Sequence, residues 1–322
     1  MPSLKEIKNR IASVNSTRKI TSAMKMVASS KLHRAQVMIE NMLPYENMLE
    51  YILKSFLAAE VEAKTIYSDE RKEIKRVAIV VFASNGSLCG GFNANIIRLL
   101  TETLEEYKDL GKENIIVYPI GRKVAEKVKK MGFQSAGNFT ELADKPNASE
   151  CIEIARNLTL MYAEGKIDKV ELIYHHFKSV GSQVLTRKTF LPIDVSTVSL
   201  ENDRDLKSSN LMSAKAQEYL RKHGSRKEKK EEDVKPLNDN FIVEPDMNTV
   251  LGSLIPRLLH LMMYTALLDS NASEHAARMV AMQTATDNAD ELLRGLNLAY
   301  NKSRQQAITN ELLDIMGGSV NK

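Results

Sequence analysis

The two ends of the chain each read as one long helix, and this feature limits the possible folds more than any other. Between Ser3 and about Leu57 there is no glycine, and Pro44 is the only internal proline. A second helical pattern runs from about Met247 to Met316. At 1.5 Å per residue such helices would be roughly 80 and 100 Å long, whereas a typical globular helix has three or four turns. We therefore expect the two helices to pack on each other as an antiparallel pair.

Each predicted helix carries an apolar seam with alternating steps of four and three residues, which is typical of a coiled coil. The N-terminal seam follows a similar one, shifted in phase near residues 16–19, and its members are Met24, Ala28, Lys31, Ala35, Met38, Met42, Tyr45, Leu49, Ile52 and Phe56. The C-terminal seam consists of Leu258, Leu261, Thr265, Leu268, Ala272, His275, Met279, Met282, Thr286, Ala289, Leu293, Leu296 and Tyr300. We interpret the methionines, and His275, as packing residues rather than cofactor or metal ligands.

Two short motifs predict where these helices begin and end. Ser3 followed by Glu6 predicts a capping box at the start of the first helix. The sequence "GGS" at 317–319 predicts the end of the second helix.

The middle of the chain alternates between strand and helix patterns over residues 75–195. Apolar runs such as "RVAIVVFA" and "NIIVYPIG" read as strands, and helical patterns follow them. This order predicts a partly parallel sheet flanked by helices, with the last two strands forming an antiparallel pair. The expected fold class mixes α+β and α/β: a long antiparallel coiled coil of the terminal helices with a central Rossmann-like α/β domain.

The expected domain boundaries follow from these patterns. Residues 1–58 form the first coiled-coil helix, 75–195 the α/β domain and 247–316 the second coiled-coil helix. Residues 196–240 are polar with a mixed charge run, and we expect a surface insertion that is helical over 212–223.

A glycine-rich turn, "SNGSLCGGFNAN" at 84–95, lies between a strand and a helix, where many α/β proteins bind a nucleotide. The turn matches neither GxxxxGK[ST] nor GxGxxG, and no lysine follows its glycines. We therefore interpret it as a tight strand-to-helix connection, although a nucleotide-dependent enzyme stays open as an alternative. No catalytic, cofactor-binding or metal-binding residues are predicted. His175 and His176 should point to opposite faces of one strand.

Charge and composition limit the possible partners. The net charge is +4, yet residues 1–35 carry eight Lys or Arg against the single acid Glu6, which favours an acidic partner, RNA or a membrane surface. The aromatic content is only 6% and no RNA-binding module is present, so nucleic acid is not expected. Cys89 and Cys151 are far apart, which argues against a zinc site or a disulfide. We see no stretch of about 18 apolar residues and expect no membrane insertion.

Three segments resemble the gamma subunit of F-type ATP synthases. They are "KEIKNRIASVNSTRKITSAMKMVASSKL" at 5–32, "SLCGGFNANI" at 87–96, and "ASEHAARMVAMQTATDNADELL" with "YNKSRQQAITNELLDI" between 272 and 315. The resemblance implies a non-catalytic rotor subunit of the central stalk, which couples ion flow through the c-ring to ATP synthesis. It implies as partners the alpha and beta subunits (a 3:3 hexamer), the epsilon subunit and the membrane c-ring. No transit segment is visible, so we expect a peripheral position on the cytoplasmic face of a bacterial plasma membrane.

The same resemblance implies contact residues. The positions expected to face the beta subunits are Met24, Lys25, Arg278, Arg304, Gln305, Thr309 and Glu311. In "FIVEPD", Phe241 and Glu244 are expected to contact the c-ring and epsilon. The family tends to have a second aromatic residue where Val243 stands. A stand-alone coiled-coil scaffold or chaperone arm is the alternative that would use the same long helices without these motifs.

Overall fold

A computed structural model describes residues 3–58, 66, 67, 71, 73–193, 244 and 247–320. The chain divides into two compact units. The first unit joins residues 1–29 to residues 278–322, and the second spans residues 30–277. The predicted insertion at 196–240 and Phe241 lie outside the described residues.

Two long helices contribute to both units. Helix α1 is Leu4–Ala58 and helix α7 is Met247–Val320. At the start of α1 the backbone N–H of Glu6 donates to Oγ of Ser3 at 3.3 Å, as the predicted cap requires. Pro44 and Pro256 both lie inside continuous helix. The predicted stop at "GGS" is wrong, because α7 continues through it to Val320.

The second unit contains a mixed five-stranded sheet in the order β3-β2-β1-β4-β5. Its strands are β1 Val77–Phe82, β2 Ile115–Ile120, β3 Gln134–Ser135, β4 Lys169–Ser179 and β5 Ser182–Leu191. Strands β1 to β4 pair in parallel, and β5 pairs with β4 in the predicted antiparallel hairpin. The expected fold class, a long helix pair with a central mixed-sheet domain, is therefore confirmed. Among the described residues, the two-residue strand β3 and the short helix at Thr140–Asp144 were not predicted.

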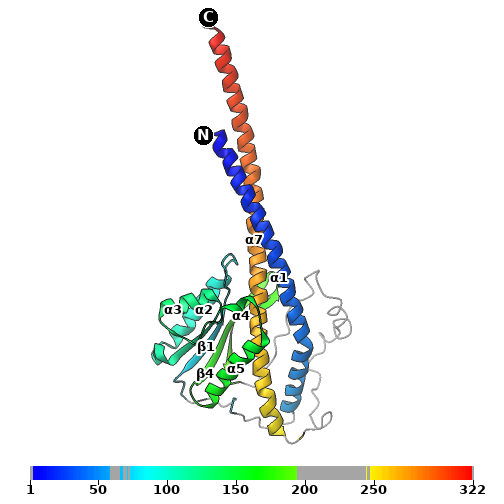
Figure 1. Cartoon of the computed structure of the whole chain (residues 1–322), viewed down its shortest axis with the longest axis vertical. Coiled ribbons are helices and arrows are strands. Elements are labelled where there is room, and N and C mark those ends of the chain that lie inside the picture. The colour runs from blue at the N-terminus through cyan, green and yellow to red at the C-terminus, as the bar shows by residue number, and fades with distance from the viewer. Residues whose placement is uncertain are drawn as a thin grey trace. The chain divides into compact units, whose positions relative to one another are not determined.

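Helices cover both faces of this sheet (Figure 1). Helices α2 (Phe92–Glu106) and α3 (Arg122–Met131) pack against one face, with Ile96 and Val124 in that core. On the other face, α5 (Ala148–Ala163), the short α4 (Thr140–Asp144) and the first half of α7 share a second core. Two 3-10 turns, Lys108–Leu110 and Lys112–Asn114, connect α2 to β2.

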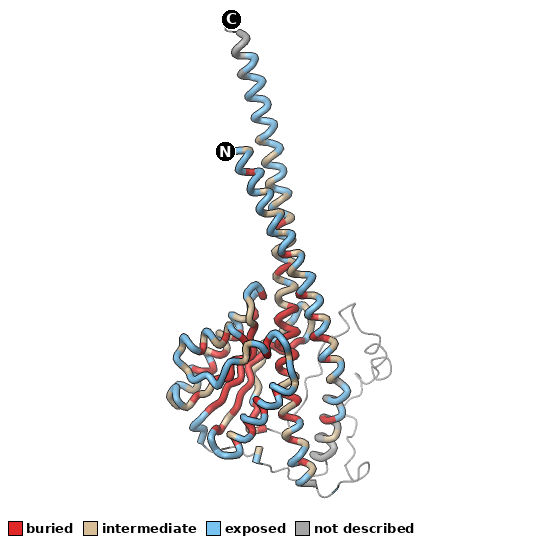
Figure 2. The backbone as a smooth tube through the Cα atoms, viewed as in Figure 1, coloured by how far each residue is buried: buried red, intermediate tan, exposed pale blue. Residues whose placement is uncertain are grey.

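The two predicted seams have different outcomes. Every member of the C-terminal seam is buried or half-buried, so that prediction is confirmed (Figure 2). In the N-terminal seam, Lys31, Met38 and Tyr45 are exposed, and α1 instead buries Leu32 and Ile39. The other seam members with described side chains are buried or half-buried as predicted, namely Met24, Ala28, Ala35, Met42, Leu49 and Ile52. The side chain of Phe56 lies outside the described residues. Helix α1 has apolar residues on more than one side, so periodicity alone cannot say which side packs.

One part of α7 meets the length and composition of a membrane span. Helix α7 contains an 18-residue window with a mean hydropathy of 1.4, which is long and apolar enough to cross a membrane by composition. About half of that window, 56%, is buried inside the protein. Leu251, Ile255, Leu258 and Leu259 contribute to the core under the sheet. Packing in the core of the second unit therefore explains why this part of α7 is apolar.

Candidate functional site

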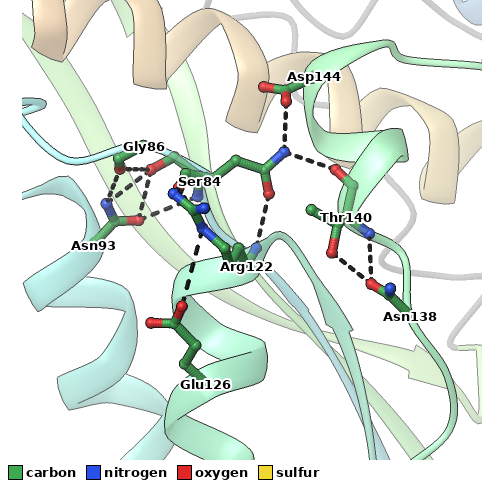
Figure 3. A network of polar contacts seen from close by, with 9 residues as sticks. Ser84, Gly86, Asn93, Arg122, Glu126, Asn138, Thr140 and Asp144 are labelled. Atoms are coloured by element: carbon green, nitrogen blue, oxygen red, sulfur yellow. Dashed lines mark hydrogen bonds and ion pairs between the residues drawn. The ribbon is translucent and has the colours of Figure 1, made fainter.

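The glycine-rich turn satisfies its polar groups with its own side chains (Figure 3). The backbone N–H of Ser84 donates to Oδ1 of Asn93 at 3.1 Å, and Oγ of Ser84 donates to the carbonyl of Gly86 at 2.6 Å. Nδ2 of Asn93 donates to the same carbonyl at 3.1 Å and contacts Sγ of Cys89 at 3.2 Å. Asn93, in the first turn of α2, thus lies where a phosphate-binding site would need free donors.

A second set of hydrogen bonds ties this turn to neighbouring elements (Figure 3). Nδ2 of Asn85 donates to the carbonyl of Thr140 and to Oδ2 of Asp144, both at 2.7 Å. The backbone N–H of Arg122 donates to Oδ1 of Asn85 at 2.8 Å, and its guanidinium donates to the Asn85 carbonyl at 2.8 Å. Arg122 is the only cation among the residues labelled in Figure 3. Its guanidinium is therefore already engaged by the Asn85 carbonyl and by the carboxylate of Glu126.

Backbone conformation explains two of the glycines in this region. Gly90 has φ +59°, in the left-handed region that favours glycine. Leu88 adopts the same region, with φ +65°. Gly121, which precedes α3, has φ +106°, and a Cβ there would clash with the carbonyl oxygen of Ala83. The prediction that the turn's glycines serve backbone geometry thus applies most clearly to Gly90.

Helix α7 covers the edge of the sheet where a Rossmann-like domain would bind a ligand. The strand order reverses direction between β1 and β4, and ligands of open α/β sheets bind beyond the carboxyl ends of the strands at such a point. Strand β4 continues past its last pair with β1 at Ile173. There His176 Nδ1 lies 2.7 Å from Oδ2 of Asp269, and Oγ of Ser273 donates to the carbonyl of His175 at 3.2 Å. Side chains of α7 therefore occupy this position.

The two adjacent histidines of β4 point to opposite faces, as predicted. His176 meets Asp269 of α7, and both side chains are almost fully buried. His175 stacks on Phe92 of α2, with ring centroids 4.5 Å apart. Burial lowers the pKa of His175 to about 4, because the interior disfavours its charged form. The pair does not form a single site.

A buried carboxylate joins β4, β5 and α2. Glu171 accepts hydrogen bonds from the Tyr107 hydroxyl at 2.7 Å and from Nε of Arg187 at 2.8 Å, and Lys169 lies 2.9 Å away. Burial alone would raise the pKa of Glu171, but hydrogen bonds from Arg187, Lys169 and Tyr107 outweigh it and lower the pKa. Arg187 also bonds Glu106 at 2.7 Å. All these charges are paired, which makes the cluster a structural link.

In the first unit, α1 and α7 form an antiparallel pair with polar contacts in the seam. The hydroxyls of Thr21 and Thr286 lie 2.8 Å apart, and Nη1 of Arg18 donates to Oδ1 of Asp290 at 3.0 Å. Because the two helices are antiparallel, residues nearer the start of α1 lie opposite residues nearer the end of α7. Continuing this register brings the first turn of α1 opposite Ser303 or its neighbours.

Beyond this point α7 has no α1 residue opposite it, and its described side chains are exposed (Figure 2). Among its polar residues the segment carries large exposed apolar side chains, which are Ile308, Leu312, Leu313, Ile315 and Met316. A contiguous exposed apolar surface on a helix marks a site of interaction with another molecule. The sequence shows these residues, but only the structure shows that α1 does not cover them.

The predicted contact residues divide between the two units. In the first unit Met24, Lys25 and Arg278 are half-buried, whereas the others are exposed on the last turns of α7. These exposed positions are Arg304, Gln305, Thr309 and Glu311. In the second unit Glu244 is exposed. Their roles as contacts stay predictions.

Sequence reasoning missed the buried polar residues Asp269, Asn271 and Ser273 of α7, although it placed His275 in the packed seam. Besides the contacts to β4, Nδ2 of Asn271 donates to the carbonyl of Ala143 at 2.9 Å. The signal was present as "DSNASEH", an unusually polar run inside an apolar helix.

Known proteins match this chain over nearly its whole length. A family model described as ATP synthase matches residues 3–320. An ATP synthase gamma chain of Phocaeicola vulgatus is 57% identical over 320 residues, covering 99% of this chain and 100% of the relative. The ATP synthase gamma chain of Bacteroides thetaiotaomicron is 52% identical over 322 residues, covering 99% and 100%. That of Cytophaga hutchinsonii is 39% identical, covering 99% and 98%.

Solved structures share the fold at low sequence identity. A chain in the Euglena gracilis mitochondrial ATP synthase, in a structure of OSCP, F1 and the c-ring, aligns with a TM-score of 0.57 and 17% identity. That alignment covers 98% of this chain and 93% of the other. A chain in the central stalk and c-ring of the Tetrahymena thermophila mitochondrial enzyme aligns with a TM-score of 0.52 and 22% identity, covering 83% and 99%.

Proposed function

The chain belongs to the gamma chain family of ATP synthases, and from this premise we propose that it is the rotor shaft of the enzyme. In this role it couples ion flow through a membrane c-ring to ATP synthesis on a hexamer of three alpha and three beta subunits. The catalytic nucleotide sites belong to the partner subunits, and this chain turns against them.

The observation that carries this proposal is the unaccompanied end of α7. Five large apolar side chains between Ile308 and Met316 are exposed on a helix that α1 no longer covers. Leaving such a surface in water is unfavourable by roughly 25 cal/mol per Å² of apolar area. A cavity lined by other subunits would bury it. The centre of a ring of subunits provides such a cavity for a single helix.

The filled strand-to-helix turn supports a non-catalytic role. Asn93 bonds the N–H of Ser84 and the carbonyl of Gly86 within the turn, and Asp269 and Ser273 of α7 lie at the adjacent sheet edge. A nucleotide enzyme built on this sheet would need that space.

An asymmetric shaft explains how one chain can drive three sites. A single helix pair inside a ring of three equivalent sites must contact each of them differently at any moment. Rotation exchanges these contacts, so each site in turn has its conformational populations shifted. We propose that seven residues contact the beta subunits: Met24, Lys25, Arg278, Arg304, Gln305, Thr309 and Glu311.

The opposite end of the shaft would contact the c-ring. We propose Glu244 and Phe241 as contacts with the c-ring and the epsilon subunit, beside the start of α7. The subunit would then lie on the cytoplasmic face of the bacterial plasma membrane without inserting into it.

Purification of the tagged chain from native membranes, followed by mass spectrometry, tests this function. We expect alpha and beta subunits in threefold excess over this chain, together with c-subunits. Recovery of the chain without alpha and beta subunits would refute the rotor role and favour an independent scaffold.

A further inference from the structure

A groove in the second unit lies between three helices and takes no part in the function proposed above. It has a volume of about 360 Å³. Met42 and Tyr45 of α1 form one wall, Ile152 of α5 forms the other, and Leu261 and Tyr264 of α7 lie between them. Most of its lining is therefore apolar or aromatic.

The groove continues into an apolar stripe along α1. Met38 and Tyr45 are 39% and 47% exposed, and they flank Met42 in steps of four and three residues. This is the stripe that the sequence predicted to pack against α7, but the structure turns it partly to solvent. A stripe with this spacing matches the apolar face of another helix. Methionine side chains adapt readily to such a partner.

The charge on the groove has one sign. Arg257 and His260 line it on successive turns of α7, and no lining residue is acidic. The Arg156 guanidinium of α5 is close enough to help lower the pKa of His260, after the larger effect of burial. The neutral form of His260 is therefore favoured, and the positive charge here comes from Arg257 and Arg156. Arginines beside an apolar floor fit a partner with acidic residues beside its apolar stripe.

The chain's own candidate helix is a poor occupant. Residues 212–223 carry Lys215, Arg221 and Lys222 against the single acid Glu218. This segment therefore has the same charge sign as the groove, and like charges facing each other disfavour docking.

We propose that the groove between α1, α5 and α7 binds an acidic amphipathic helix of another protein chain. Its apolar stripe packs on Met42, Tyr45 and Ile152, and its carboxylates pair with Arg257. The proposal concerns the second unit alone and does not require the rotor role.

Site-specific photo-cross-linking in the native complex tests the proposal. Tyr45 is replaced by p-benzoylphenylalanine, the complex is irradiated in membranes, and the cross-linked peptide is sequenced by mass spectrometry. Leu160 is the matched control site, because it is 49% exposed on α5 but does not line the groove. We expect position 45, and not position 160, to cross-link to one segment with apolar residues at three- and four-residue spacing and a net negative charge.

Charge variants then test the pairing. Arg257→Glu should lower the cross-link yield at least fivefold, whereas Arg257→Lys should keep it. Arg156→Glu provides a second charge reversal, and thermal melting checks that each variant is folded; both arginines are exposed.

Several results would overturn the proposal. A cross-link from position 45 to residues 194–243 of the same chain, to lipid or to a basic segment would do so. So would the absence of any cross-link. A cross-link yield that charge reversal leaves unchanged in folded variants would also do so. Co-purification with alpha and beta subunits is scored separately, so failure of the rotor role is distinguishable from failure of the groove proposal.

Discussion

His176 of β4 and Asp269 of α7 meet through Nδ1 and Oδ2 at 2.7 Å, although they are 93 positions apart in the chain. Both side chains are nearly inaccessible to water, so this contact satisfies hydrogen-bonding groups that water cannot reach. This contact attaches one of the long helices to the central sheet.

Removing the Asp269 carboxylate should destabilise the protein more than removing an exposed one. Asp269→Ala leaves a buried imidazole without this partner, which costs about 1–3 kcal/mol. The matched control is Asp290→Ala, whose ion pair with Arg18 is about 40% exposed on both sides and is worth about 0–1 kcal/mol. Urea unfolding followed by circular dichroism measures both. Equal losses would contradict the structural role of the buried contact.

Two asparagines of α2 should behave differently when replaced. Asn93→Ala removes the acceptor of the Ser84 N–H and should cost about 1–3 kcal/mol of stability. Asn95→Ala, at an exposed position in the same turn, should change stability by less than about 0.5 kcal/mol. Thermal unfolding compares them. Isothermal titration of the isolated wild-type chain with Mg-ATP should show no saturable binding, and tight binding would restore the nucleotide-enzyme alternative.

A methyl group at Gly121 should be far more harmful than one at Gly252. Gly121→Ala combines a left-handed φ with a clash against the Ala83 carbonyl, and we expect a loss of more than about 3 kcal/mol or no folded protein. Gly252→Ala lies in α7 with open space around the added carbon, so it should stabilise by up to about 1 kcal/mol. Expression level and melting temperature distinguish the two outcomes.

Stability should fall as the pH drops from about 6.5 to about 4, partly because of His175. Its pKa is 6.5 in the unfolded chain and about 4 when folded, so the unfolded state binds a proton first. The stabilisation is complete above pH 6.5 and is lost towards pH 4, by about 3 kcal/mol. His175→Phe, which keeps the stacking partner of Phe92, should flatten the profile in this window. An unchanged profile would argue against the buried neutral histidine.

The proposed beta contacts should affect coupling and not folding. Arg278→Ala and Gln305→Ala should each lower ATP synthesis in membrane vesicles while leaving the melting temperature of the isolated chain within a few degrees of wild type. Arg294→Ala, at another exposed position of α7, serves as the control. Normal synthesis rates in both variants would show that these contacts are misplaced.

Local patterns were sufficient for much of the fold. The C-terminal seam was predicted correctly because its members recur at steps of three and four residues, and helical periodicity is a local property. Helix α7 also buries residues outside the seam, such as Leu259 and Met263. The hairpin of β4 and β5 followed from two strand patterns joined by a short polar turn. The short strand β3 has too few residues to produce a pattern.

Local patterns could not predict which side of α1 is buried. Helix α1 offers Met38 and Tyr45 on one side and Leu32 and Ile39 on the other, and only packing in the second unit selects the latter pair. The exposed stripe that results is the basis of the groove proposal.

The sequence by itself determined the two long helices, the mixed sheet and the absence of nucleotide-binding motifs in the glycine-rich turn, because each depends on residues close together in the chain. Only the tertiary structure decided that α7 covers the sheet edge beside that turn, through Asp269 and Ser273, and that its final turns have no α1 partner. Such contacts join residues about a hundred positions apart. Their energies depend on burial and distance, which no local pattern encodes.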